Sequence, residues 1–253
     1  MILLTRYKHC FKILNCPVAA LCIALTFSIL PAAADTVVIY GASGNIGSKI
    51  VSEALNRNHD VIGVSRNPAT LTIEHSNFTA VQGDVTSLDS MLEIIDGTDA
   101  VIMAVRGNGT DNSAEQAVSN RASLTFIEAS KQLGASTPRV IQVGNQATLY
   151  RNGVLGLDSG RYEKGTALYG RVRAHALLLD NYRASSHVKW TVASPSGSIK
   201  PGNRTGNYRV GGDEVLLNKN GKESGISEED FAVAFIDEIE KPQAIGRRIA
   251  IGY

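Results

Sequence analysis

Three glycines in the spacing G-x-x-G-x-x-G separate a short apolar run from a stretch with helical periodicity. The run, residues 36–40, is typical of a parallel strand buried on both faces. Apolar residues then recur at 46, 50, 51 and 55, the spacing of one helix face. A strand that enters a helix through such a loop begins a dinucleotide-binding βαβ unit. The phosphates are expected at the N-terminus of the helix, on Gly41, Ser43, Gly44, Asn45, Ile46 and Gly47.

The three glycines are expected to have different tasks. Gly41 permits a tight turn, Gly44 lets a pyrophosphate approach the backbone, and Gly47 lets the helix pack closely against the sheet. The loop therefore predicts both the fold and the class of ligand.

Strands and helices are expected to alternate along most of the chain. Further strands are predicted at 61–64, 78–81, 100–104, 140–143, 189–192 and 248–251. Helices are predicted at 88–95, about 113–133 and 166–183, and a last helix follows a capping box of Ser227 and Asp230. Residues 196–225 are rich in glycine and predict loops with a hairpin. The pattern predicts an α/β fold, a single Rossmann-type domain with a doubly wound parallel sheet.

The first 34 residues have the three parts of a secretory signal. Basic residues up to Lys12 precede an apolar stretch at 18–30, and Ala32-Ala33-Ala34 provides an Ala-x-Ala cleavage site. The stretch is short for a membrane span, which needs about 20 residues. We expect a signal peptide at 1–34, a mature domain at 35–253, and export to the periplasm or medium. Without cleavage the chain is membrane-anchored or cytoplasmic.

The composition excludes several functions. The formal net charge is +1, and no basic run follows the first dozen residues, so no nucleic-acid partner is expected. All three cysteines lie within residues 1–34, which leaves the mature domain without thiol chemistry. His59, His75, His175 and His187 are scattered without metal-ligand spacing, and most are expected to be exposed. No metal site is predicted, and the oligomeric state is left open.

Residues after the predicted strands are candidates for the rest of a cofactor site. Arg66 follows the second strand, where a domain that prefers NAD(H) places an acid on the ribose 2′-hydroxyl. A guanidinium favours the 2′-phosphate of NADP(H) instead, unless Arg66 is simply a solvated loop residue. Asp84, followed by Val85, either bonds the adenine amino group or caps the next helix. Ala104 and Val105 follow the fourth strand at the same edge.

The chain resembles the NmrA-like, NAD(P)H-binding branch of the atypical short-chain dehydrogenase/reductases. The glycine loop, Ser65-Arg66-Asn67-Pro68 and Gly83-Asp84-Val85 carry this resemblance. The last third is similar to the NADH-flavin reductase group in Trp190-Thr191, Ser194-Pro195, Pro201-Gly202, Arg204-Thr205-Gly206, Gly211-Gly212-Asp213, Asp230-Phe231-Ala232 and Ile251-Gly252-Tyr253.

The resemblance implies a Rossmann sheet carrying NADP(H) and a small C-terminal substrate lobe over the nicotinamide. It also implies that the segment from Ser194 through Pro195 to Gly197 lies beside the nicotinamide. Members of this group reduce flavins or quinones, or only sense the cofactor.

The chain departs from the family in its acid-base residues. The superfamily pattern Tyr-x-x-x-Lys has its nearest counterpart in Tyr169 and Arg173, which share a helix face. Arg173 supplies charge but cannot relay a proton. Gly144 and Asn145 stand where many relatives carry a catalytic Ser or Thr. Alcohol or ketone chemistry is therefore not favoured.

Three functions remain open. The first is hydride transfer from NADPH to FMN, FAD or a quinone, a small-molecule redox substrate, with Asn145, Tyr169 and Arg173 on the substrate side. The second is a non-enzymatic NADP(H)-binding regulator. The third is an NAD(P)-dependent epimerase or dehydratase that uses Tyr169.

Overall fold

The computed structural model describes residues 34–106 and 113–253, and an eight-stranded sheet forms their centre. All neighbouring strands pair in parallel except the last pair, in which β10 runs antiparallel to β12. The strands in chain order are β1 (Thr36–Tyr40), β2 (Asp60–Ser65), β3 (Phe78–Gln82), β4 (Ala100–Met103), β5 (Arg139–Val143), β8 (Trp190–Pro195), β10 (Arg209–Gly211) and β12 (Arg247–Gly252).

The order of the strands reverses beside β1. The sheet runs β3-β2-β1-β4-β5-β8-β12-β10, so β2 and β3 lie on one side of β1 and β4 lies on the other. The loops that follow β1 and β4 therefore diverge at the carboxyl edge, which is where open α/β sheets bind ligands. The predicted fold class, a doubly wound Rossmann-type sheet, is confirmed.

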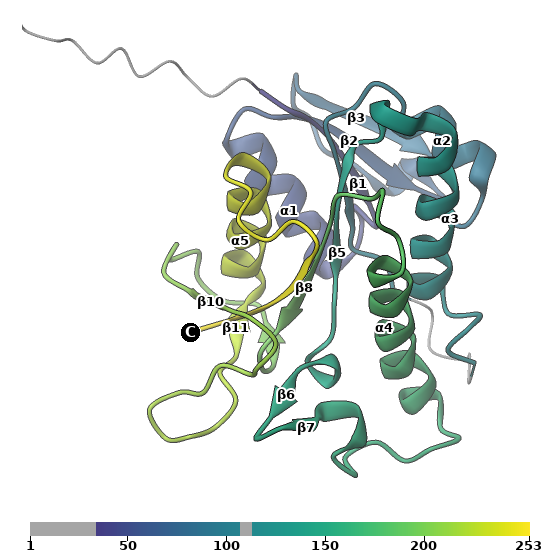
Figure 1. The fold of residues 1–253 in the computed structure, drawn as a ribbon. Coiled ribbons are helices and arrows are strands. Elements are labelled where there is room, and N and C mark those ends of the chain that lie inside the picture. The colour runs from purple at the N-terminus through teal and green to yellow at the C-terminus, as the bar shows by residue number, and fades with distance from the viewer. Residues whose placement is uncertain (1–33, 107–112) are drawn as a thin grey trace, which may run out of the picture. The chain divides into compact units, whose positions relative to one another are not determined.

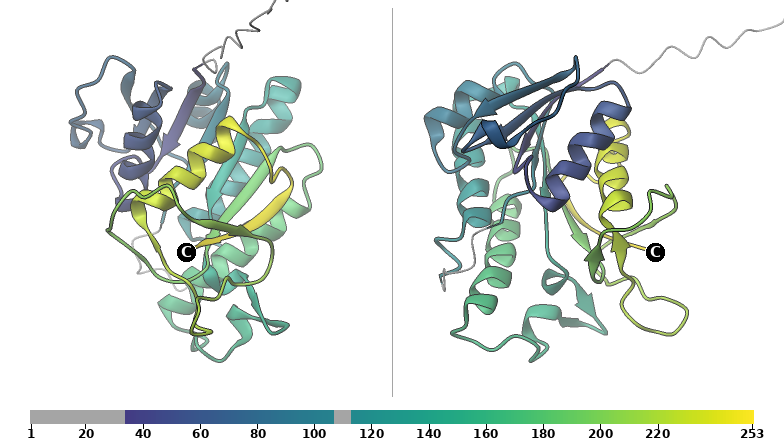
Figure 2. Two further views of the ribbon diagram at one scale, coloured as in Figure 1. Left: turned by 90° about the vertical axis from the view of Figure 1, so that its left-hand side faces the viewer. Right: turned by 180° about the vertical axis from the view of Figure 1, so that it is seen from behind.

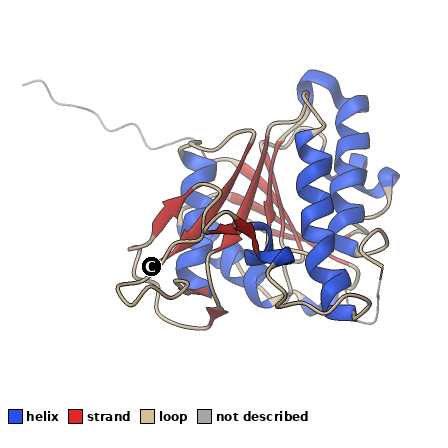
Figure 3. Cartoon of the chain, turned by 60° about the horizontal axis from the view of Figure 1, so that its bottom comes forward, coloured by secondary structure: helices blue, strands red, loops and turns tan. Residues whose placement is uncertain are grey.

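Helices cover both faces of this sheet, as Figures 1 and 2 show. On one face α1 (Asn45–Asn56) packs beside α5 (Glu228–Glu240). On the other face lie α2 (Leu88–Ile95), α3 (Val118–Leu133) and α4 (Ala167–Arg183), and α3 contacts both of its neighbours. The strands between the two helical layers are also visible in Figure 3.

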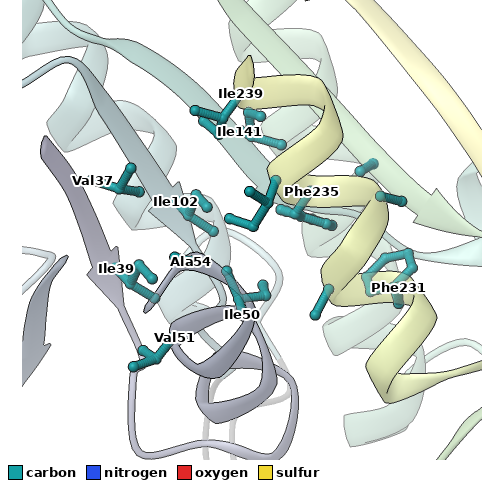
Figure 4. Packing of buried hydrophobic residues seen from close by; sticks show 14 of the residues in the cluster. Val37, Ile39, Ile50, Val51, Ala54, Ile102, Ile141, Phe231, Phe235 and Ile239 are labelled. Carbon is teal, nitrogen blue, oxygen red and sulfur yellow. The ribbon is translucent and has the colours of Figure 1, made fainter. Parts of the chain in front are cut away.

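The core consists of two apolar layers separated by the sheet. Alternate residues of one strand enter different layers, so Val37 and Ile39 of β1 join α1 and α5, whereas Val38 and Tyr40 join the helices of the other face. In the first layer, Phe235 of α5 lies close to the sheet (Figure 4). Burial on both faces explains why the strands are continuous apolar runs rather than alternating ones.

One predicted boundary was wrong. The helix expected from about residue 113 begins at Val118, because residues 114–116 form a turn. Residues 196–225 are mainly loops, as predicted, and they contain a minimal hairpin in which Leu217 and Glu223 form an antiparallel bridge. The other short strands of this stretch pair with segments outside it. β9 (Ile199–Lys200) pairs with β11 (Ile226–Ser227), while a separate small sheet joins β6 (Tyr150–Arg151) to β7 (Val154–Leu155).

A buried carboxylate ties α1 to the loop that precedes β10. Glu53 of α1 is 3% exposed and accepts from Nε of Arg57 at 2.7 Å and from Nε of Arg204 at 2.6 Å. Arg57 also pairs with Asp237 at 2.7 Å on α5. Burial alone would raise the pKa of Glu53, but the two guanidinium groups outweigh it and lower the pKa. The network thus joins α1 and α5 to the loop-rich residues 196–225, which we call the C-terminal lobe.

A second buried carboxylate, Asp230, fastens the same lobe to the start of α5. The predicted capping box is half correct, since Ser227 Oγ accepts from the Asp230 N–H at 3.0 Å. The Asp230 carboxylate does not return to Ser227 but accepts from the Thr205 N–H at 2.7 Å and the Gly206 N–H at 2.8 Å. The Tyr253 hydroxyl donates to it at 2.8 Å. Burial favours a higher pKa, but these bonds outweigh it and lower the pKa of Asp230.

Over the residues described, no helix is both long and apolar enough to cross a membrane.

Replacing Asp230 with Asn is expected to lower the free energy of unfolding by roughly 3 kcal/mol, because a buried charged acceptor loses strong hydrogen bonds. Since the folded pKa is depressed, the loss is largest near neutral pH. It shrinks as the pH falls below about 4, where the unfolded carboxyl protonates. Urea unfolding at several pH values measures both effects. The matched control is Asp180→Asn at an exposed ion pair of α4, and an equal loss in both variants would contradict the assignment.

Candidate functional site

A cavity of about 1000 Å³ lies along the carboxyl edge of the sheet. Its wall is formed by the residues that follow β1, β2, β3, β4, β5 and β8, with contributions from α3 and α4. It brings together most of the predicted cofactor and substrate residues, namely Gly41, Ser43, Gly44, Asn45, Ile46, Arg66, Asp84, Val85, Ala104, Val105, Gly144, Asn145 and Pro195.

The glycine loop has the backbone that phosphate binding requires. Gly41 has a φ of +81°, and a Cβ on it would lie 2.5 Å from the carbonyl oxygen of Ala104, so no other residue fits there. Gly44 is the N-cap of α1, and no side chain caps the first turn of that helix. The N–H groups of this turn are therefore available to an anion from the cavity.

Gly47 differs from its expected role. A Cβ on Gly47 would lie 2.0 Å from the carbonyl oxygen of Gly41, so this glycine lets α1 approach the loop rather than the sheet. It is buried and does not line the cavity. Gly44 is the more open position, since its added Cβ would meet only the Gly41 oxygen at 3.2 Å.

The ends of β2 and β3 make a charged wall. Arg66 and Asp84 both line the cavity, and so does Arg121 of α3, which the sequence did not single out. The Thr86 backbone N–H, followed by its hydroxyl and the charges of Arg121 and Arg66, holds the pKa of Asp84 below its usual value. The alternative role of Asp84 as a helix cap is wrong, because Ser87 caps α2.

The ends of β5 and β8 meet in a tightly packed corner. A Cβ on Gly144 would lie 2.2 Å from the Ser194 hydroxyl oxygen, so only glycine lets these strand ends approach. Asn145 Oδ1 accepts from the Ala147 N–H at 2.9 Å and caps a short turn. Asn145 also lines the cavity.

Tyr169 and Arg173 are not among the residues that line this cavity. They lie on α4, whose cavity-facing residues are Leu168, Val172 and His175. Arg173 pairs instead with Glu115 at 3.4 Å. The side of α4 that faces the cavity is therefore not the side that carries Tyr169 and Arg173. Their catalytic role stays a prediction without geometric support.

His175, rather than the predicted Tyr169, is the residue of α4 with a titratable side chain at the cavity wall. It is 8% exposed, and no described residue partners its Nδ1. Desolvation lowers its pKa to about 4, although the backbone of Val143 acts in the opposite direction, so the ring is neutral at physiological pH. The expectation that most histidines are exposed was also wrong for His59, which is 2% exposed. In the described chain, no group of three or more His, Cys, Asp or Glu side chains is arranged to hold a metal ion.

A family model for NAD(P)H-binding proteins matches residues 41–242. The chain belongs to this NAD(P)H-binding family. The match begins at the first glycine of the loop and covers every residue of the cavity wall except Tyr40. The chain is thus a nicotinamide-cofactor-binding Rossmann protein of the oxidoreductase-like and epimerase-like class, consistent with the NmrA-like resemblance.

Three solved structures are similar over nearly their full length. A "putative epimerase" from Bacteroides thetaiotaomicron is 34% identical, with a TM-score of 0.76 and coverage of 87% of this chain and 97% of that one. A "putative exported protein" from Burkholderia pseudomallei is 30% identical, with a TM-score of 0.73 and coverage of 87% and 100%. A "putative NADH-flavin reductase" from Streptococcus pneumoniae is 26% identical, with a TM-score of 0.72 and coverage of 86% and 99%.

Alanine substitutions distinguish the binding role of Gly44 from the packing role of Gly47. Gly47→Ala is expected to lower Tm, because its Cβ collides with the backbone of Gly41. Gly44→Ala is expected to keep Tm within a few degrees and to weaken NADPH binding by about 10-fold or more, since its Cβ takes space the phosphates need. Thermal melts and calorimetry measure these effects. Gly212→Ala is the control, with no atom within 4 Å of its added Cβ, and unchanged binding in Gly44→Ala would refute the phosphate site.

Proposed function

We propose that the protein is an NADPH-dependent reductase that passes hydride to a flavin or quinone. The observation that carries the proposal is the continuous cavity, which extends from Arg66 across the glycine loop to the ends of β5 and β8. One end offers what a phosphorylated nucleotide needs, and the other offers apolar side chains, uncharged polar side chains and the carboxyl group of Glu228.

The residues present fit a nicotinamide dinucleotide. The uncapped first turn of α1 offers N–H groups for the pyrophosphate, and Gly44 leaves the room that a Cβ would fill. Arg66 supports a preference for the 2′-phosphate of NADP(H), because no acid follows β2 to receive a ribose hydroxyl. Arg121 adds a second guanidinium to the same wall.

The substrate end supports hydride acceptors that need no protein acid. When bound, NADPH supplies two electrons as a hydride, and a flavin or quinone that accepts them takes one proton from water. Tyr169 and Arg173 lie outside the cavity wall, and Asn145 replaces a Ser or Thr. Asn145 and His175 are then left to orient the acceptor, since burial keeps the pKa of His175 far below neutrality.

Turnover decides between the three functions. Purified protein from Asp35 to Tyr253 is mixed with NADPH and riboflavin or menadione, and loss of reduced nicotinamide absorbance is followed. Multiple turnovers that survive Tyr169→Phe are expected. Binding without turnover would favour a regulator over a reductase. Loss of all turnover in Tyr169→Phe would favour chemistry that uses this hydroxyl, as in an epimerase or dehydratase.

Arg66→Ala tests the cofactor preference. We expect NADPH affinity to fall by about 10-fold to 100-fold, as for the loss of charge-assisted hydrogen bonds, while NADH affinity stays the same. Calorimetry with both nucleotides measures this. Arg183→Ala, which removes an exposed charge at the end of α4, is the control. An equal loss for NADH would show that Arg66 does not read the 2′-phosphate.

Export of the domain after cleavage at Ala34 is also our proposal. It is supported by the tripartite pattern of residues 1–34 and by the name of the Burkholderia pseudomallei relative. N-terminal sequencing of the protein recovered from cell fractions tests it, with Asp35 as the expected first residue. Recovery of an intact Met1 chain would contradict cleavage.

A further inference from the structure

Two of the three cations on the cavity wall lie toward the same end. The arginines among the residues that line it are Arg66 after β2, Arg106 after β4 and Arg121 on α3, and no lysine does so. Arg66 and Arg121 both act on the Asp84 carboxylate at the end of β3, which places them toward that edge of the sheet. A dinucleotide with a pyrophosphate and a 2′-phosphate matches this positive end.

The opposite end, which we call the acceptor half, begins beyond β4. It is lined by residues after β5 and β8 and by residues of, or just before, α4 and α5. These are Asn145, Gln146, Tyr162, Leu168, Val172, His175, Gly197, Ser198, Ile199 and Glu228. Among these described residues there is no lysine or arginine, and the sequence of 107–112, outside the described part, contains none either.

Three arginines that do not line the cavity are held in ion pairs. Arg161 binds Glu223 through two hydrogen bonds, at 3.1 and 2.9 Å. Arg173 pairs with Glu115, and Arg204 pairs with the buried Glu53. To reach an anion in the acceptor half, any of these three guanidinium groups would have to leave its ion pair.

The carboxyl group of the acceptor half is that of Glu228. It is 7% exposed and stands at the first position of α5, where the helix dipole favours a negative charge. Lys49, whose ammonium group feels the charge of Glu228, forms its ion pair with the next residue, Glu229, at 3.0 Å. Close to Glu228, an anionic group on the acceptor meets repulsion in a partly desolvated site, where charges are weakly screened.

The remaining polar groups are neutral, and His175 is one of them. Burial holds its pKa at about 4, so it does not offset the charge of Glu228 near neutral pH. Its Nδ1 has no partner among the described residues. Tyr162, Leu168, Val172 and Ile199 supply apolar surface on which a flat ring can pack.

We infer that the acceptor half takes an uncharged planar ring system, a quinone or a flavin without a phosphate group, and that Glu228 discriminates against anionic acceptors. This inference rests on the proposed reductase function and narrows its substrate class.

Matched acceptors test the inference. Riboflavin and FMN share one redox-active ring system, and only FMN carries a phosphate group. Menadione and naphthoquinone-2-sulfonate are both naphthoquinones, and only the second is an anion. With saturating NADPH, kcat/KM is expected to be at least about 10-fold higher for the neutral member of each pair. The difference is expected to shrink as salt is added, because repulsion is screened.

Substitution of Glu228 tests whether its carboxylate is the source of the repulsion against anionic acceptors. Glu228→Gln is expected to reduce the riboflavin-to-FMN ratio to within about 3-fold, mainly by raising kcat/KM for FMN. Glu229→Gln is the matched control, because it removes an adjacent charge that does not line the cavity, and its ratio is expected to stay high. If Glu228→Gln does not fold, the ratios and salt dependence of the unmodified protein still test the inference.

The outcomes separate the inference from the function on which it rests. No oxidation of NADPH with any acceptor would contradict the reductase proposal itself. Turnover with FMN equal to or faster than with riboflavin would overturn the inference and leave the reductase standing. An equal change of ratio in Glu228→Gln and Glu229→Gln would overturn the assignment to Glu228.

Discussion

The close approach of two backbone segments at Gly41 sets the geometry of the whole site. A Cβ there would stand 2.5 Å from the Ala104 carbonyl, so the turn after β1 can pass the end of β4 only as glycine with a positive φ. That turn aims α1 along the sheet and brings its uncapped first turn to the carboxyl edge. β1 and β4 are neighbours at the reversal of strand order. The chain leaves these two strands toward opposite faces of the sheet, and the cavity lies between the diverging loops.

The acceptor half depends on a different kind of interaction. Its wall includes residues 197–199, which belong to a lobe with little regular structure. Hydrogen bonds to the Asp230 carboxylate hold residues 205 and 206 of that lobe against α5. The cofactor end is thus shaped by backbone sterics and the acceptor end by buried polar contacts. Polar contacts of this kind depend on both partners, so the loss of either one leaves the other without its hydrogen bonds.

Local sequence predicted the parts of the site whose position follows from chain order. The glycine loop, Arg66, Asp84 and Asn145 stand directly after strands, and the parallel sheet brings those ends to one edge. The sequence missed Arg121, His175 and Glu228, because which helical residues face a cavity depends on how each helix packs. A signal for His175 was present, since Leu168, Val172 and His175 share one helix face, but the polar pair Tyr169 and Arg173 matched a known motif more closely. The pairing of β9 with β11 joins residues that are too far apart in the sequence for a local pattern to predict it.

The Glu53 network also has an evolutionary consequence. Loss of Glu53 alone would leave Arg57 and Arg204 with fewer carboxylate partners, and loss of one arginine would leave a buried carboxylate undercompensated. Substitutions at these three positions are therefore expected to arise together among homologues. A lobe exchanged between relatives would therefore need a matching residue on α1, which couples sequence changes in the lobe to sequence changes in that helix.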